Sequence, residues 1–164
     1  MRRSLALAAL VLATTAHAQL VPPDPDWRET APPPPPALRT DRLIPLEMPA
    51  SSLRWGVDPD SITIGQDQVV RYVVVATGPQ ALTALYEGLR CQSGEVKVYM
   101  RHNGSDWQPV SGSEWRPIRE TPGTRHSWQI ARSGACSGRS AALSPREAVR
   151  LLRNGPDIRD TPRF

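Results

Sequence analysis

The alternation of hydrophobic and polar positions predicts a run of β-strands through the middle of the chain. Residues 69–76 are rich in β-branched side chains and apolar on both faces except at Arg71, a pattern typical of a central strand. After a turn at 77–80, residues 82–91 predict the next strand, although their first residues are also compatible with a helix. Residues 95–101 alternate cleanly, as a half-buried strand does.

Shorter signals extend this sheet on both sides. Residues 61–64 predict a strand near the start of the folded part. Asn103-Gly104 predicts a hairpin, because both residues tolerate a positive φ, and the return strand carries Trp107. A further strand is predicted over residues 125–132.

One helix is predicted near the C-terminus. Ser144 is a capping residue, Pro145 occupies the first helical position, and Glu147 is placed to complete a capping box. Gly155 ends the helix, whose apolar side is expected to lie on the sheet. Strands followed by a helix indicate an α+β fold, with an antiparallel sheet of about five or six strands and one C-terminal helix packed on it.

The N-terminus has the pattern of a secretion signal. Arg2 and Arg3 precede an apolar run at 5–13, and residues 16–18 form a small-x-small cleavage site. The run is too short to span a bilayer. We therefore expect residues 1–18 to be removed after Ala18 and the mature protein to reside in the periplasm. The cut chain has no N-terminal thiol for a lipid, so no stable membrane anchor is expected.

The mature chain is predicted to contain one domain. Residues 19–42 are rich in proline and are expected to be an unstructured linker, in which five consecutive prolines form a stiff polyproline II spacer. Only Trp27 in this stretch has a reason to pack on the domain. Residues 43–155 form the predicted domain and residues 156–164 a polar tail.

The charge of the chain does not point to nucleic acid. The formal net charge of +4 falls by two when Arg2 and Arg3 are removed with the signal. The remaining basic residues are scattered among acids rather than gathered in a stripe, which phosphate binding needs. We expect no nucleic-acid partner.

Cys91 and Cys136 are the two cysteines, and an oxidising periplasm favours a disulfide between them. Closing a loop of this length stabilises a fold by roughly 4 kcal/mol in the chain-entropy model. The alternative is a reactive thiol at residue 136, since residues 134–138 match a G-x-C-x-G elbow. That elbow belongs to α/β-hydrolases, whose βαβ repeats are missing from this pattern.

Familiar catalytic patterns are missing from the sequence. His102 and His126 have no metal-ligand spacing, and there is no phosphate loop or G-x-S-x-G elbow, so neither metal nor cofactor is expected. Glu87 and Glu114 are conceivable as a glycosidase pair but are better interpreted as solvated or ion-paired acids.

Arginine and tryptophan supply the remaining candidates. Arg71 lies in mid-strand and must find a partner, for which Glu87 on the next strand is the main candidate and a ligand the alternative. Five tryptophans either fill the core or form a glycan-binding surface. Trp115 and Arg116, beside a proline, are candidates for an edge site.

Four segments resemble a known family, the CNP-one-like proteins of the proteobacterial envelope. They are residues 69–72, residues 86–91, residues 115–118, and Cys136 with the helix at 145–153. The resemblance implies an exported domain with two cysteines and implies no activity. The basic, small-residue stretch at 133–140 departs from it.

These observations predict a non-enzymatic binding or envelope-assembly module whose partner is an envelope protein or a glycan. The alternatives are a peptidoglycan- or glycan-binding protein and a small periplasmic hydrolase. Any functional cluster is expected among the Arg, Glu and aromatic residues of the resembling segments, namely Arg71, Tyr86, Glu87, Arg90, Trp115 and Arg116.

Overall fold

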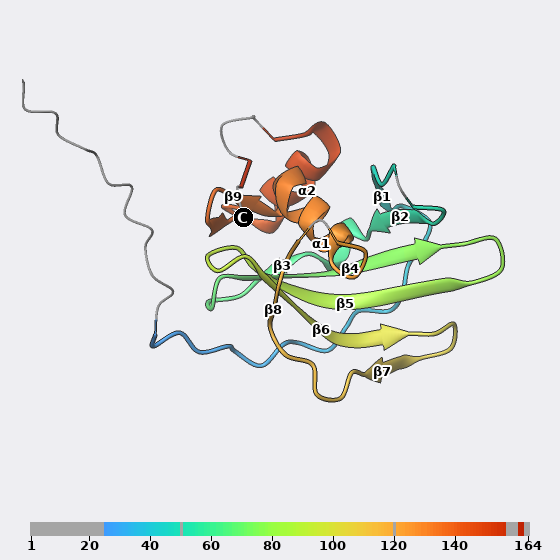
Figure 1. Cartoon of the computed structure of the whole chain (residues 1–164), viewed down its shortest axis with the longest axis horizontal. Helices are drawn as coiled ribbons and strands as arrows, with labels where there is room; N and C mark the ends of the chain where they lie inside the picture. The colour runs from blue at the N-terminus through green and yellow to red at the C-terminus, as the bar shows by residue number, and fades with distance from the viewer. Residues whose placement is uncertain (1–24, 50, 120, 157–160, 163–164) are drawn as a thin grey trace, which may run out of the picture.

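The fold is built on one antiparallel sheet, whose strands β4 to β7 lie one below the other in Figure 1. The computed structural model describes residues 25–49, 51–119, 121–156 and 161–162, so the predicted signal lies outside the described residues. Within them, six strands run in the order β1-β2-β4-β5-β6-β7, while β3 pairs with β4 and β8 with β6. The strands are β1 (Ile44–Leu46), β2 (Arg54–Val57), β3 (Thr63–Ile64), β4 (Val69–Thr77), β5 (Leu82–Arg90), β6 (Glu95–His102), β7 (Trp107–Pro109) and β8 (Arg116–Pro117).

The remaining elements follow or interrupt these strands. They are the 3-10 turn η1 (Pro59–Ser61), the helix α1 (Arg125–Ile130), the π-helical turn η2 (Ala131–Ala135), the short pair β9 (Cys136–Ser137) and β10 (Ser140–Ala141), and the helix α2 (Pro145–Asn154). The predicted α+β class is confirmed. None of the helices in the described parts of the chain has the length and apolar character needed to cross a membrane.

The long hairpin β4–β5 is the centre of the sheet. Its register places Arg71 opposite Gly88 and Tyr72 opposite Glu87. Because successive side chains of a strand point to opposite faces, Tyr72 and Glu87 share one face and Arg71 points to the other. The predicted strands at 69–76 and 82–91 are confirmed.

One face of the sheet is covered by the helices, and this helix face contains the larger core. Val70, Tyr72 and Leu89 from the strands pack with Ala148 and Leu152 of α2. The predicted disulfide between Cys91 and Cys136 is present, with Cα atoms 5.7 Å apart. It ties the end of β5 to the segment between the two helices.

Helix α2 begins as predicted. The Ser144 hydroxyl accepts a hydrogen bond from the backbone N–H of Glu147 at 3.1 Å. The Glu147 carboxylate accepts hydrogen bonds from Arg150 at 2.7 and 2.8 Å. It therefore forms an ion pair on the exposed face of the helix and does not complete the predicted capping box. Gly155 follows the last turn with φ 80°.

The strand predicted over 125–132 is wrong, because this segment forms α1. Its buried side chains, His126, Ser127 and Ile130, recur at helical rather than alternating spacing. Gly134 then adopts φ 131°, and a Cβ there would lie 2.2 Å from Leu151 of α2. The close approach of α2 therefore favours a helical path for the segment before Gly134. Local strand propensity does not indicate this contact.

Residues 25–42, which belong to the predicted linker, form no helix or strand but contact the sheet. This N-terminal strap runs along the face of the sheet opposite the helices and is blue at the lower side of Figure 1. Leu38 of the strap packs with the apolar cluster of Val73, Val75 and Tyr86. The strap is ordered because the sheet presents partners for it; residues 19–24 lie outside the described residues.

Candidate functional site

The six predicted site residues do not form one cluster. Arg71, Tyr86 and Arg90 lie on the face covered by the strap, where Trp115 also contacts the strap. Glu87 lies on the helix face, and Arg116 is exposed in β8. The predicted Arg71–Glu87 ion pair is wrong, because the register points the two side chains to opposite faces.

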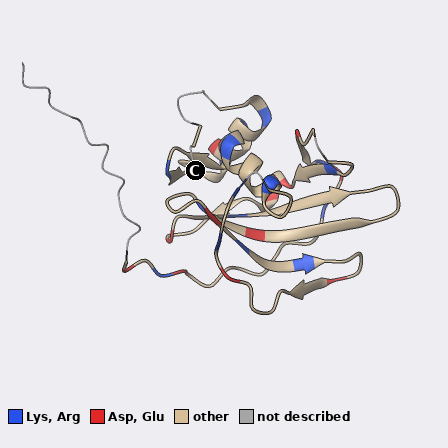
Figure 2. Cartoon of the chain, viewed as in Figure 1, with Lys and Arg blue, Asp and Glu red and all other residues tan. Residues whose placement is uncertain are grey.

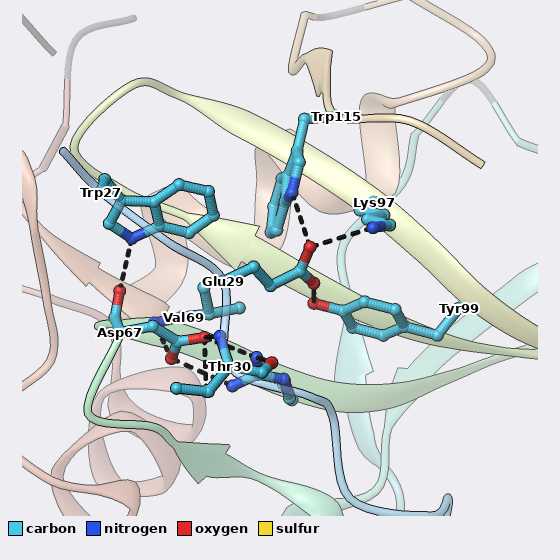
Figure 3. Close-up of polar contacts among 9 residues, drawn as sticks. Trp27, Glu29, Thr30, Asp67, Val69, Lys97, Tyr99 and Trp115 are labelled. Atoms are coloured by element: carbon cyan, nitrogen blue, oxygen red, sulfur yellow. Dashed lines mark hydrogen bonds and ion pairs between the residues drawn. The ribbon is translucent and has the colours of Figure 1, made fainter. Parts of the chain in front are cut away.

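Arg71 is instead paired with Asp67, and both bind the strap. The guanidinium is 2.7 Å from the Asp67 carboxylate and donates to the carbonyl of Thr30 at 2.9 Å. Thr30 donates its backbone N–H and its hydroxyl to the same carboxylate, at 3.0 and 2.8 Å. The strap thus supplies one of the hydrogen-bond acceptors of an arginine that is only 2% exposed. Figure 3 shows Thr30 of the strap beside Asp67.

Asp67 is ionised over almost the whole pH range. Burial favours its neutral form, but hydrogen bonds from Arg71 and Thr30 outweigh burial and lower its pKa to about 2. The same pairing raises the pKa of Arg71, against the effect of its own burial. Both members of the Asp67–Arg71 ion pair therefore remain charged beneath the strap.

Glu29 of the strap is held by three donors from the domain. Its carboxylate accepts from Lys97 at 2.9 Å, Tyr99 at 2.8 Å and Trp115 at 3.1 Å (Figure 3). Burial opposes ionisation, yet these three hydrogen bonds lower the pKa of Glu29. Burial and the nearby Glu29 carboxylate raise the pKa of Tyr99, so its hydroxyl remains a donor. These contacts form a carboxylate clamp made of Lys97, Tyr99 and Trp115.

Trp27 fixes the beginning of the strap. The Arg90 guanidinium carbon lies 3.8 Å from the centroid of the indole, within cation–π range, and the indole meets Trp115 edge to face at 5.8 Å. Its N–H donates to the carbonyl of Asp67 at 3.0 Å. Three of the predicted site residues, Arg71, Arg90 and Trp115, therefore meet along the strap.

The proline run follows an aromatic groove. Residues 32–35 line it together with Tyr86 and Tyr99, over a volume of about 430 Å³. The Trp107 indole N–H donates to the carbonyl of Pro36 at 3.0 Å. Within the described residues, no backbone-to-backbone hydrogen bond joins the strap to the sheet. The strap is bound by side chains, with Arg39 at its far end contacting Asp58 and Asp60.

The helix face contains a second polar group, buried around Glu87. Its carboxylate accepts from Tyr72 at 2.9 Å and Ser127 at 3.1 Å and is 2.9 Å from His126 Nε2. Burial opposes ionisation, whereas His126 and these hydrogen bonds lower the pKa of Glu87. Because Ser127 and His126 both bind the carboxylate, the hydroxyl donates to Glu87 rather than to a general base, unlike a serine nucleophile.

Core packing, the first interpretation of the tryptophans, holds in part, because Trp55 and Trp107 pack against the two buried apolar clusters. All five are half-buried: Trp27, Trp55, Trp107, Trp115 and Trp128. Trp27 belongs to the strap, and Trp107 and Trp115 contact it. Lys and Arg positions are interleaved with acids over strands, helices and loops (Figure 2). The parts of the chain that the structure describes contain no group of three His, Cys, Asp or Glu side chains suited to a metal ion.

Sequence reasoning missed the strap's own contribution. The sequence pattern predicts a linker at Glu29 and Thr30 and does not indicate a site at Asp67, Lys97 or Tyr99. The one available signal was local: Trp27, Glu29 and Thr30 stand together directly before the proline run, and an amphipathic cluster is unusual in a pure spacer. Trp27 was expected to pack on the domain, and it does.

The fold and this face define a small disulfide-bonded α+β domain that holds an extended segment across its sheet. The chain belongs to the CNP1-like family, whose model matches residues 23–153. The resemblance in the sequence is thus confirmed, and the matched range takes in the strap. Comparisons with curated proteins and with solved structures gave no match.

Proposed function

We propose that this protein is exported to the periplasm by residues 1–18 and acts there as a non-enzymatic binding module. Its ligands are extended, acidic, proline-rich protein segments, and its own strap occupies the binding face in cis. The observation that carries the proposal is the carboxylate clamp, in which Lys97, Tyr99 and Trp115 converge on a single carboxylate.

The mode of attachment supports recognition rather than ordinary strand pairing. Domains that bind proline-rich segments use aromatic grooves that fit a preformed polyproline II helix. Here residues 32–35 form one wall of the groove beside Tyr86 and Tyr99, and an indole donates to a proline carbonyl. A segment held by side chains can leave without breaking a ladder of backbone hydrogen bonds.

The spacing of the contacts defines the ligand. An indole or another large ring is needed at the position of Trp27, a carboxylate at that of Glu29, and prolines from residue 32 onward. A partner in the envelope that carries this pattern would compete with the strap. Because the strap is tethered, its effective concentration is on the order of millimolar, so a partner must bind more tightly or meet a loosened strap.

The test is a titration of the mature full-length protein with a synthetic peptide of residues 25–40. In Glu29→Ala the strap loses its clamp contact, so the peptide should bind at least fivefold more tightly than it binds the natural chain. Adding Lys97→Met should remove that gain, since it dismantles the clamp itself. Glu47→Ala, which changes an exposed carboxylate elsewhere, is the matched control.

Isothermal titration calorimetry gives the affinity and stoichiometry directly. Equal and weak heats for the natural chain, Glu29→Ala and Glu47→Ala would contradict the proposal, because the strap would then be a permanent part of the fold. Far-UV circular dichroism on each variant shows that the domain remains folded.

A further inference from the structure

An open groove lies on the helix face, at the end of the sheet that the helices leave bare. In Figure 1 the β4–β5 hairpin extends well beyond α1 and α2. The groove has a volume of about 610 Å³ and is lined by Trp55, Ala76, Leu85 and the turn at 78–81. This volume lies within the range of small-molecule sites.

The wall of the groove is held in place by polar contacts that leave its surface apolar. The Ser51 hydroxyl accepts from the backbone N–H of Leu53 at 3.1 Å and from the Trp55 indole N–H at 3.0 Å. The indole therefore has no free donor to offer the groove. Leu53 is 38% exposed and packs on the turn, where a Cβ at Gly78 would lie 3.0 Å from its Cδ2.

The charge of the groove has one sign. Arg101 lines it, opposite Leu85 in the β5–β6 register, and the lining contains no acidic residue. Among the described residues, Arg101 makes no ion pair in the structure. An exposed guanidinium beside an apolar surface is complementary to a ligand with an apolar body and an anionic head.

We propose that this groove binds a single-chain anionic amphiphile, an acyl carboxylate, with its chain on Trp55 and Leu85 and its head on Arg101. An extended peptide fits less well. The floor is formed by central strands whose backbone groups already pair within the sheet, so peptide amides on it would lack partners. A hydrocarbon chain has no such requirement. This site goes beyond the proposed function, since the strap lies on the opposite face.

The test uses calorimetry on the mature full-length protein with three probes: dodecanoate below its micelle concentration, dodecyltrimethylammonium, and acetate. We expect saturable one-to-one binding of dodecanoate, at least tenfold weaker binding of the cationic probe, and no binding of acetate. Absence of saturable dodecanoate binding, or equal affinity for both head groups, would overturn the proposal.

Two substitutions locate the site. Arg101→Glu should weaken dodecanoate at least tenfold and strengthen the cationic probe, whereas Arg146→Glu, on the exposed side of α2, should change neither. Thr83→Trp fills the groove and should remove binding of both dodecyl probes. Unchanged affinity in Arg101→Glu and in a folded Thr83→Trp would place the amphiphile elsewhere and contradict the proposal. Tighter binding of an apolar peptide than of dodecanoate would contradict it as well.

Discussion

The two faces of the same sheet each bury a charged residue of the central hairpin, and they satisfy it differently. Glu87 is 1% exposed and is enclosed by Tyr72, His126 and Ser127, beneath helices fastened by the disulfide. Arg71 is also 2% exposed, but the strap supplies part of its environment through Thr30. One face is a closed core, and the other is a surface whose cover is held by side chains alone.

This difference distinguishes contacts that only stabilise the fold from contacts that are available for binding. The side chains that bind Glu87 lie beneath helices fastened by a disulfide, so they can separate from it only when the domain unfolds. Under the proposed function, a partner supplied by the strap leaves while the sheet persists, since the ladders of β4, β5 and β6 do not include it. The following variants are expected to affect the two faces to different extents.

The largest effect is expected on the helix face. Glu87→Ala leaves the Tyr72 hydroxyl and the His126 ring without their buried acceptor and should lower the free energy of unfolding by about 4 kcal/mol. Chemical denaturation measures the change. A loss below about 1 kcal/mol would show that this group is not the closed core described above.

An intermediate effect is expected where the strap meets the sheet. The folded pKa of Asp67 is about 2 against an ordinary 3.8, so its ionised form stabilises the fold above about pH 4. That stabilisation, about 2 kcal/mol, is lost as the pH falls from about 4 through 2. Asp67→Asn should lack this part of the acid dependence. Identical pH profiles of stability for the variant and the natural chain would contradict the assignment.

The smallest effect is expected at Arg116. This side chain is exposed in β8 and makes no ion pair among the described residues, so Arg116→Ala should change stability by less than about 0.5 kcal/mol. In the same titration, the Arg116→Ala variant should bind the peptide of residues 25–40 with the affinity of the natural chain. A fivefold weaker affinity would extend the binding face to β8.

Much of the fold was accessible from the sequence because its signals are local. Strict alternation marks β6, β-branched residues mark β4, and the cap at Ser144 marks α2. The helix α1 was missed because Trp128 and Ile130 have strand propensity, while the packing of α2 on Gly134 decides the outcome. That contact joins residues distant in sequence, and propensity carries no information about it.

The site was only partly accessible for a related reason. Arg71, Arg90 and Trp115 were identified as candidates, yet the pairing of Arg71 with Glu87 assumed that neighbouring strands place them on one face. The register, set by the turn at 78–81, decides otherwise. The strap was invisible as structure because a polyproline segment has no internal hydrogen bonds and no hydrophobic period. Its order comes from partners elsewhere in the chain.

Amide hydrogen exchange under native conditions tests the central claim most directly, because it reports the opening of each face separately. The Thr30 N–H is bonded to the Asp67 side chain at the strap, whereas the Val73 N–H, in the central strand β4, is bonded to the buried hydroxyl of Ser61 in η1. The account predicts that Thr30 is protected at least a hundredfold less than Val73 and becomes still less protected in Glu29→Ala, with Val73 unchanged. Equal protection of both amides, lost together on global unfolding, would show that the strap is a permanent part of the domain and would contradict the account.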